Sequence, residues 1–252
     1  MLSLVCTALD PWQTDAHDQL PVGPLGARAR ARTEVTAAIK DAARRRLAAE
    51  GAARLSLRAV ARELGMVSSA LYRYFPSRDD LLTALITDAY DSLGEAAETA
   101  HARVADAASL RRWTAVCEAV RHWALAHPHE YALIYGTPVP GYSAPDATVP
   151  AASRVGLLLL GVARDAHERG ELTAPPLPPE LAPEADRMAA DLAPGLPPAA
   201  MPSLIAAWAQ LFGLVGFELF GQFERVVEAR EEFFRHAAVR LGRAAGLTGE
   251  DT

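Results

Sequence analysis

Apolar residues recur three and four positions apart along most of this chain, which is the spacing of one face of an α-helix. The first such segment, 32–51, carries its apolar stripe at Val35, Ile39, Ala42, Ala43 and Leu47. Thr33 is suited to cap the start of this segment, and Gly51 is suited to end it in the left-handed backbone region. The pattern predicts a helix from Thr33 to Gly51.

Two short segments and one long segment follow. The stretch "SLRAVARELG" starts at Ser56, a favourable N-cap, and its apolar stripe is Leu57, Val60, Ala61 and Leu64. Gly65 begins a tight turn, and Ser68 is expected to cap a third helix that ends near Phe75. The next residue is a proline, and Ser77 then caps the long segment "RDDLLTALITDAYDSLGEAAETA". Two short helices around a glycine turn predict a helix-turn-helix.

The third of these helices carries an unusual run, "LYRYF". Leu71 and Phe75 lie four positions apart and can share one buried face, so Tyr72, Arg73 and Tyr74 should point elsewhere. A tyrosine offers a flat apolar ring and a hydroxyl that can bond a phosphate or a base edge. The small residues that start this helix, 68–70, would let its end enter a major groove, where free N–H groups favour a phosphate.

The C-terminal part continues the helical pattern. The stretch "SLRRWTAVCEAVRHWALAHP" places one apolar face at Leu110, Trp113, Val116, Cys117, Val120, Trp123 and Ala124. Further helices are predicted in "HEYALIY", in "VPAASRVGLLLLGVARDAHERG" and as a final pair over 203–246. Proline-rich stretches at 170–200 predict an exposed, poorly ordered linker. Half of the residues are hydrophobic and long β-branched runs are missing, so we expect an all-α protein with a substantial core.

The distribution of charge changes what the net charge suggests. The chain as a whole carries −6, which alone argues against binding nucleic acid. Residues 28–78 hold 12 Lys and Arg against 4 Asp and Glu, a net +8, whereas the remainder holds 13 against 27, a net −14. Attraction to phosphate is local, because salt screens charges beyond about 10 Å. A basic module joined to an acidic body therefore favours DNA binding by the helix-turn-helix.

The segment "LSLRAVARELGMVSSALYRYFPSRDDLLTALI" resembles the DNA-binding domain of the TetR-type repressors, and the likeness covers about residues 33–85. Tyr74 stands where the family often has His, and Arg78 keeps the charge of a frequent Lys. The resemblance implies backbone contacts from Tyr72 and Arg78, with base reading from the start of the third helix. The candidate DNA-binding residues are Ser56, Arg58, Val67, Ser68, Ser69, Ala70, Tyr72, Arg73, Tyr74 and Arg78.

Residues 109–220 resemble a C-terminal domain type of the same family that is named for a Trp-His-Gly motif. "HPHEYALIYGTPVPGY" and "AWAQLFGLVGFELFG" carry this likeness, with Phe212 in place of the expected His. Rings that line a cavity suit a small apolar or aromatic ligand, although the same rings can simply fill a core. The candidate ligand-binding residues are Trp113, Cys117, Val120, Trp123, Tyr131, Tyr135, Trp208 and Phe212.

The first helix of the final pair is apolar on nearly every side and must be covered all round. Either the chain buries it entirely, or a second copy covers one side; we favour a two-fold homodimer. Gly213 and Gly216 permit close approach of another helix. The candidate interface residues are Leu211, Leu214, Phe217, Phe220 and Phe234.

Two other classes of protein were weighed. An enzyme is disfavoured because His122, His127 and His129 have no partners at metal-ligand spacing, and no nucleophile or phosphate-binding motif occurs; no metal or cofactor is expected. An architectural DNA-binding protein without a ligand is the second alternative. We expect instead a homodimeric repressor that binds a palindromic operator in double-stranded DNA and is released by a small-molecule effector.

The expected organisation is a disordered tail over 1–30, a helix-turn-helix over 31–78 and a helical body over 79–247. Residues 79–100 form the connecting helix of that body. Only Cys6 and Cys117 could pair, and no uninterrupted apolar run reaches the roughly 18 residues of a membrane span. A reduced, cytoplasmic protein is the simple expectation.

Overall fold

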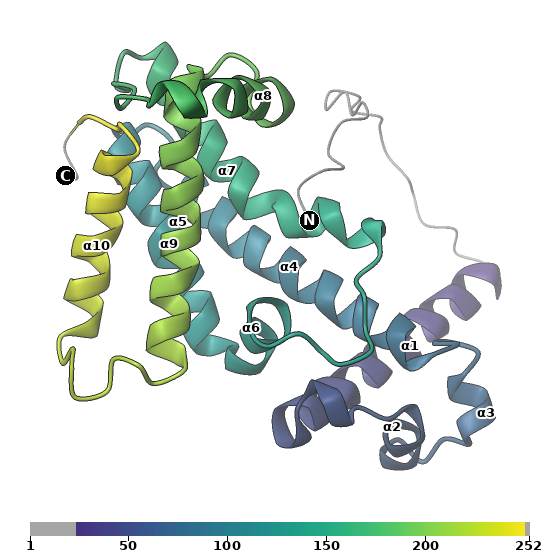
Figure 1. Ribbon diagram of the computed structural model, residues 1–252. Helices are drawn as coiled ribbons and strands as arrows, with labels where there is room; N and C mark the ends of the chain where they lie inside the picture. The colour runs from purple at the N-terminus through teal and green to yellow at the C-terminus, as the bar shows by residue number, and fades with distance from the viewer. Residues whose placement is uncertain (1–23, 250–252) are drawn as a thin grey trace. The chain divides into compact units, whose positions relative to one another are not determined.

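The computed structural model describes residues 24–249, and helices dominate them, which confirms the all-α prediction. The helices are α1 (Pro24–Glu50), α2 (Leu57–Glu63), α3 (Ser68–Leu71), α4 (Arg78–Ala102), α5 (Ser109–Ala126), α6 (Pro128–Tyr135), α7 (Val149–Glu168), α8 (Ala182–Leu192), α9 (Met201–Leu219) and α10 (Arg230–Ala244) (Figure 1). Extended pairing within the described range is limited to an isolated bridge between Leu172 and Leu247.

The chain divides into two compact units. The first contains the described residues up to Ile86 together with Pro138–Pro145, and the second contains Thr87–Thr137 and the residues from Asp146 onward. The boundary therefore falls inside α4 rather than between 78 and 79. The inclusion of Pro138–Pro145 in the first unit was not expected from the sequence. Tyr142 from this segment hydrogen-bonds Thr83 of α4 through their hydroxyls at 2.9 Å.

The first unit is the predicted helix-turn-helix. Its core joins apolar stripes from α1, α2, α3 and the start of α4, with these buried residues: Ile39, Ala42, Ala43, Leu47, Leu57, Val60, Ala61, Leu71, Phe75, Leu81, Leu82 and Leu85. Gly51 and Gly65 have φ of 78° and 65°, so both turns use the backbone region that glycine tolerates best.

The helix ends of this unit differ in part from expectation. α1 begins at Pro24, so Thr33 lies inside the helix and its hydroxyl donates to the Ala29 carbonyl at 3.1 Å. Residues 24–30 are thus helical, while the rest of the predicted tail, 1–23, lies outside the described residues. Val67, not Ser68, is the N-cap of α3. Ser77 does cap α4, since its Oγ accepts from the backbone N–H of Asp80 at 3.1 Å.

α5 is the centre of the second unit, where it packs against α7, α9 and α10. Figure 1 shows α5, α9 and α10 side by side in this unit. One buried pair of charges ties the layer together: Arg121 of α5 donates twice to the Glu218 carboxylate of α9, each time at 2.7 Å. The Arg121 guanidinium also lies 5.5 Å from the ring centre of Phe234 on α10.

The prediction of an exposed, poorly ordered linker over 170–200 is wrong. This segment contains α8 and two 3₁₀ turns, and it buries Ala185, Ala189 and Leu196 against the body. Three of its prolines, Pro179, Pro183 and Pro198, occupy the first two positions of helical turns, where a missing N–H costs nothing. A proline-rich composition here marks helix starts.

Two segments, Asp146–Glu168 and Pro198–Leu219, are long and apolar enough to cross a membrane by length and composition alone. They correspond to α7 and α9 with their preceding turns, and both contribute buried residues to the core of the second unit.

Candidate nucleic-acid interface and effector-domain sites

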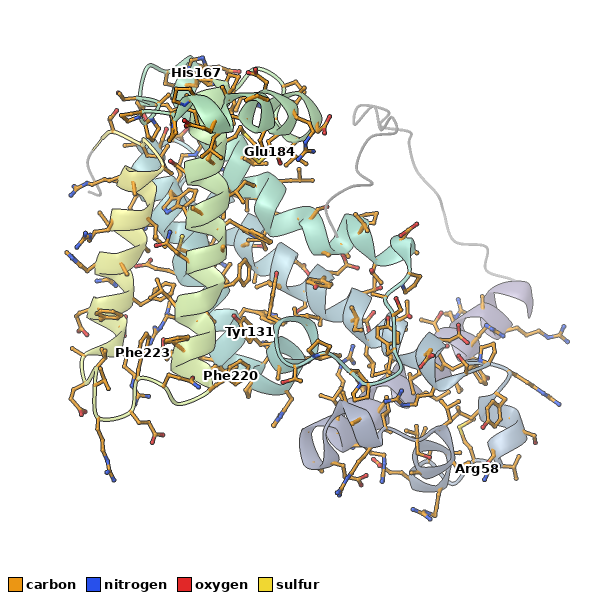
Figure 2. The ribbon with its side chains drawn as sticks, viewed as in Figure 1. Arg58, Tyr131, His167, Glu184, Phe220 and Phe223 are labelled. Atoms are coloured by element: carbon orange, nitrogen blue, oxygen red, sulfur yellow. The ribbon has the colours of Figure 1, made fainter. Side chains whose placement is uncertain are left out.

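The predicted DNA-binding residues all retain solvent access in the first unit. Six of them are exposed: Ser56, Arg58, Val67, Ser69, Tyr72 and Arg73. The other four are half-buried: Ser68, Ala70, Tyr74 and Arg78. Tyr72 keeps 42% of its surface exposed although it is a large aromatic residue, and Arg58 extends from α2 (Figure 2).

Tyr74 has a partner that the sequence analysis missed. The guanidinium of Arg32, on α1, lies 5.2 Å from the centre of the Tyr74 ring, a distance at which a cation is attracted to the ring face. Arg32 also lies within 3.5 Å of the Arg73 carbonyl oxygen. The signal for Arg32 was present in the basic run of α1, but its spacing from α3 could not be deduced without the fold.

Arg78, which was predicted to bind phosphate, makes several contacts within the first unit. Its Nη2 donates to the carbonyl of Ala52 at 2.9 Å, and its Nε donates to the carbonyl of Leu55 at 3.1 Å. Nη2 also lies 3.4 Å from the Ala53 carbonyl, and Nη1 lies 3.5 Å from the carboxylate of Asp79. Through these contacts Arg78 joins the start of α4 to the turn before α2, and its role in phosphate binding stays a prediction.

The arginines of the first unit divide into two groups. Arg44, Arg45 and Arg46 of α1 form ion pairs within the unit, and the last two both reach Glu63 of α2. The other group shows no ion pair with any described residue and consists of Arg28, Arg30, Arg32, Arg54, Arg58, Arg62 and Arg73. The positive charge without an ion pair therefore belongs to the first half of α1, to the turn before α2, to α2 itself and to the turn after α3.

In the second unit, part of the predicted ligand-binding set is tightly packed core. Trp113, Cys117 and Val120 have no exposed surface, and the Trp113 indole N–H donates to the Ala238 carbonyl at 3.1 Å. Burial also raises the pKa of the Cys117 thiol, which keeps it protonated. These three residues are buried core positions in this structure, and their role in ligand binding stays a prediction.

Three of the other predicted rings, Tyr131, Tyr135 and Phe212, do come together. Tyr135 stacks on Phe212 at 4.2 Å between ring centres, and Tyr131 lies 5.2 Å from Tyr135. Tyr90 of α4, which the sequence analysis missed, meets Tyr135 edge-on at 5.9 Å. The Tyr131 hydroxyl donates to the Phe212 carbonyl at 2.8 Å, and burial raises its pKa (Figure 2). This aromatic cluster joins α4, α6 and α9.

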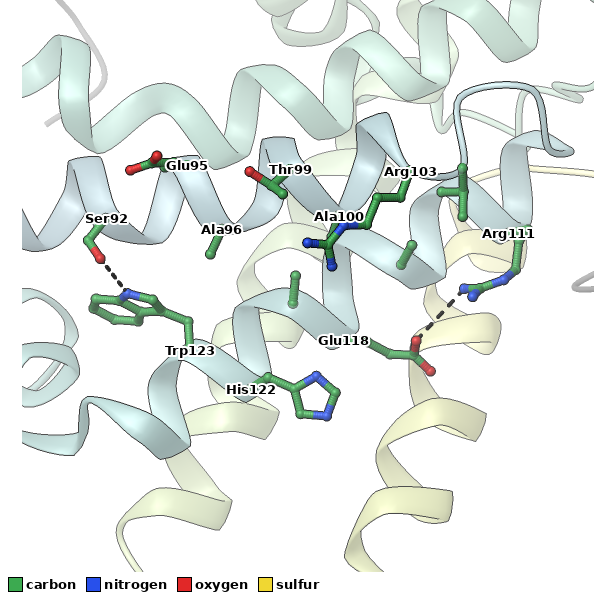
Figure 3. A pocket seen from close by; sticks show the side chains of 13 residues that line it. Ser92, Glu95, Ala96, Thr99, Ala100, Arg103, Arg111, Glu118, His122 and Trp123 are labelled. Carbon is green, nitrogen blue, oxygen red and sulfur yellow. Dashed lines mark hydrogen bonds and ion pairs between the residues drawn. The ribbon is translucent and has the colours of Figure 1, made fainter.

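A cavity of about 830 Å³ opens between α4 and α5, and most of the predicted ligand-binding residues do not line it. Four alanines contribute to its lining, two from each helix: Ala96, Ala100, Ala115 and Ala119. Figure 3 shows Arg103, which follows the end of α4, and His122 of α5 extending into this region. Trp123 alone among the predicted ligand-binding residues lines the cavity, and its indole N–H donates to Ser92 of α4 at 2.9 Å.

The predicted interface residues differ in how far the chain itself buries them. Leu211 and Phe234 are buried within the chain and are corrected to core positions. Leu214 is half-buried, whereas Phe217 and Phe220 keep 55% and 48% of their surfaces exposed. Two further rings of this segment extend the surface: Phe223 meets Phe217 at 5.9 Å, and Phe233 meets Phe223 at 5.5 Å.

The histidines considered as metal ligands have other surroundings. The His127 ring stacks on Trp123 at 5.0 Å between centres and joins α5 to α6, while His129 is exposed. Within residues 24–249, no three His, Cys, Asp or Glu side chains are placed to hold a metal ion together.

Comparison with known proteins agrees with this geometry. Residues 39–85 match the model of bacterial regulatory proteins of the tetR family, and residues 113–241 match the tetracyclin repressor-like C-terminal domain. The second match is consistent with the Trp-His-Gly resemblance but does not specify it. The HTH-type transcriptional regulators Rv1816 of Mycobacterium tuberculosis (strain ATCC 25618 / H37Rv) and Mb1846 of Mycobacterium bovis are each 39% identical over 212 residues, covering 79% of this chain and 86% of theirs.

Solved structures agree as well. The regulatory protein SCO4313 is 34% identical, with a TM-score of 0.72 over 85% of this chain and 98% of its own. RolR, in complex with resorcinol, shares the fold at 16% identity, with a TM-score of 0.50 over 89% of this chain and 100% of its own. These relatives are regulators and not enzymes. The chain is a DNA-binding transcriptional regulator of the TetR family.

Proposed function

We propose that this regulator is a homodimeric repressor that a small-molecule effector releases from a palindromic operator. The cavity between α4 and α5 carries the proposal. Its volume lies within the roughly 300–1,000 Å³ of small-molecule sites, and one of its walls is α4. Because α4 continues into the helix-turn-helix unit, a ligand in this cavity would act directly on the helix that connects to α2 and α3, where the proposed DNA-binding residues lie.

The energetic requirement on such an effector is modest. It must bind the conformation that releases DNA more tightly than the conformation that holds it. Tenfold relief of binding needs about 1.4 kcal/mol of that difference. In a dimer the two recognition helices should lie about 34–36 Å apart to enter successive major grooves, so a small displacement of α4 is sufficient to spoil the fit.

The lining of the cavity refines the expected effector. Alanines give it an apolar surface, while Arg103, Glu118 and His122 supply charge and hydrogen-bonding groups. We therefore propose a small aromatic compound that carries polar substituents, in place of a purely apolar one. The resorcinol complex of RolR makes phenols a reasonable first class to screen.

The outer surface of α9 supports a dimer. Ala206, Gln210, Gly213 and Phe217 recur at helical spacing and are all exposed. Small residues let a second helix approach closely, and exposed phenylalanines supply apolar area. We propose that a second copy covers this surface together with Phe220. Phe217→Glu should give a folded monomer by sedimentation, whereas Phe234→Glu, which buries a charge inside the chain, should unfold it.

For the DNA contacts, we propose phosphate binding by Arg58, Tyr72 and Arg73, with base reading by Ser69 and Tyr74. Site selection from random duplexes tests the second group, because one good base contact contributes about 1–3 kcal/mol of discrimination. Ser69→Ala and Tyr74→Ala should shift the selected consensus. An unchanged consensus would remove these residues from base reading.

The effector site is tested by narrowing the cavity. Ala119→Phe places a ring in the space between α4 and α5, and Ala126→Phe places the same ring on the exposed surface of α5 as a matched control. We expect compounds that release the operator from the wild type and the control to lose potency against Ala119→Phe. Equal potency against all three proteins would place the effector elsewhere. If no compound from the screen releases the operator, the architectural alternative gains support.

A cytoplasmic location follows from the proposed role, since a repressor must reach the chromosome. The apolar helices α7 and α9 are then core and interface helices of the second unit.

A further inference from the structure

Gly94 is an unusual residue for its position, because it lies in the middle of the 25-residue helix α4. Glycine there costs about 1 kcal/mol of helix propensity relative to alanine. The structure supplies a reason for it. A Cβ at Gly94 would lie 2.6 Å from Nε of Arg154 and 2.9 Å from its Cδ and Cζ, so the arginine side chain of α7 lies directly against the backbone of α4 at this glycine.

Arg154 makes four hydrogen bonds from this position. Its Nε and Nη2 donate to the two carboxylate oxygens of Glu98 at 2.9 and 2.7 Å. Its Nη1 donates to both the carboxylate and the main-chain carbonyl of Asp91, each at 2.9 Å. Asp91 and Glu98 lie two helical turns apart on α4, with Gly94 between them. The two carboxylates raise the pKa of Arg154 further.

This arrangement needs an arginine and a glycine together. A planar guanidinium can bond one carboxylate in bidentate fashion while its remaining nitrogen reaches a second acceptor, and a lysine ammonium cannot. Isolated surface ion pairs contribute little, but bidentate geometry within a network is the recognised exception. The contact spans two turns of α4 and uses a backbone carbonyl, so it fixes both the position and the rotation of α4 against α7.

The chain between α6 and α7 makes a second attachment to α4. Tyr142 in this segment bonds Thr83 within the first unit, and Arg154 lies 12 residues further along, in the second unit. Residues 142–154 are therefore a second covalent connection between the units, in addition to α4.

We infer that Arg154 is a positioning residue that clamps α4 to α7, so that a displacement of one is transmitted to the other. Gly94 provides the space for this clamp, and Asp91 and Glu98 provide its acceptors. DNA binding by the first unit is thereby coupled to the packing of α7 in the second. The use of this coupling by an effector rests on the proposed function, but the coupling between α4 and α7 does not. Coupling between two sites is reciprocal, so it can be measured from the DNA side.

The test is hydrogen–deuterium exchange on the full chain with and without a duplex selected from a random-sequence pool. In the wild type, the duplex should slow exchange in residues 57–80 and also change exchange in α7. In Arg154→Met, the change over 57–80 should remain and the change in α7 should be lost. Gly94→Ala should give the same loss, because its methyl group displaces the guanidinium although alanine favours the helix.

Gly94→Ala distinguishes a role of Arg154 in coupling α4 to α7 from a role in stability alone. If Arg154 served only stability, the better helix former would leave transmission to α7 intact. Arg187→Met is the matched control, since Arg187 also pairs with two carboxylates, Glu184 and Asp191, but within its own helix. Arg187→Met should show the same DNA-induced change of exchange in α7 as the wild type. An α7 response that persists in Arg154→Met and Gly94→Ala, or that is absent from the wild type, would overturn the inference. The probe is DNA, so neither result can be confused with the lack of an effector.

Discussion

Arg78 offers the sharpest test of how the DNA-binding unit is built. Resemblance to the TetR family implies a backbone phosphate contact at this position, whereas the structure shows the guanidinium bonded to the main-chain carbonyls of Ala52 and Leu55. Arg78→Ala should therefore reduce the stability of the helix-turn-helix and have little direct effect on its attraction for DNA. Arg73→Ala is the matched control, because the Arg73 side chain is exposed and forms no ion pair with the described residues.

The size of the effect follows from the contacts. Hydrogen bonds that involve a charged group contribute roughly 1.5–3 kcal/mol each when buried, and two of these bonds have good geometry, at 2.9 and 3.1 Å. The side chain keeps 29% of its surface exposed, so water can replace part of the loss. We expect Arg78→Ala to lower the free energy of unfolding by about 2 kcal/mol, and Arg73→Ala to leave it nearly unchanged.

Two assays distinguish the roles. Urea unfolding measures the loss of stability, and titration of duplex DNA at several salt concentrations measures the number of phosphate contacts. Each contact contributes about −0.9 to the slope of log K against log salt. Arg73→Ala should reduce the magnitude of this slope by about one contact, while Arg78→Ala should leave it unchanged under conditions where the unit stays folded.

The opposite pattern would refute this reasoning. If Arg78→Ala unfolds at the same urea concentration as the wild type and reduces the magnitude of the salt slope by about 0.9, then Arg78 contacts phosphate. Its carbonyl bonds would then be a feature of the unbound protein only. Arg78→Lys adds a further check, because lysine keeps the charge but cannot bond both carbonyls through a rigid fork. It should bind DNA with a normal slope and still lose stability.

Three further predictions concern the second unit. Arg121→Met should cost about 3–5 kcal/mol in urea unfolding, because it leaves Glu218 charged and buried, whereas replacement of both residues by Met should cost clearly less. Gly242→Ala should cost about 1–3 kcal/mol and change Trp113 fluorescence, because its Cβ would lie 2.9 Å from Cδ1 of that ring; normal stability with an unchanged spectrum would contradict this packing. Burial, with a nearby arginine, lowers the pKa of His101 in the folded chain. As the pH drops, the unfolded chain therefore takes up a proton before the folded chain does, and the free energy of unfolding should fall below about pH 6.5. His101→Phe should remove that part of the pH dependence.

The sequence was sufficient to predict the helices and the core of the first unit. There, each helix is amphipathic and each break carries a glycine, serine or proline whose conformational effect is local. Prediction failed where the same residue type serves two purposes. The prolines of 170–200 suggested disorder, yet three of them begin helical turns at and around α8. The sequence does not distinguish the two cases, because a proline at the start of a helix and a proline in a loop have the same backbone φ.

The candidate sites were predicted less completely, and for a different reason. The apolar pattern of the sequence predicts that Trp113, Leu211 and Phe234 are buried. It does not show whether a ligand, a second subunit or the chain itself covers them. The structure shows that the chain does. Exposed Phe217 lies on the same helix as Leu211, so the distinction depends on the side of α9 that each residue faces, which composition cannot specify.

The arginines show most clearly that the sequence predicts which residues are present in a region but not what they contact. The count of charges located the basic module correctly, but it treated every arginine as available to DNA, including Arg45, Arg46 and Arg78, which bond within their own unit. What makes an arginine available is the absence of a carboxylate or carbonyl at the correct distance, and that depends on residues far away in the chain. Arg154 shows the converse case. It is an arginine in the acidic part of the chain, and its role follows only from its contact with a glycine 60 positions earlier. The net charge of a segment therefore predicts what kind of partner it attracts, while the contacts of each arginine decide which of them meets that partner.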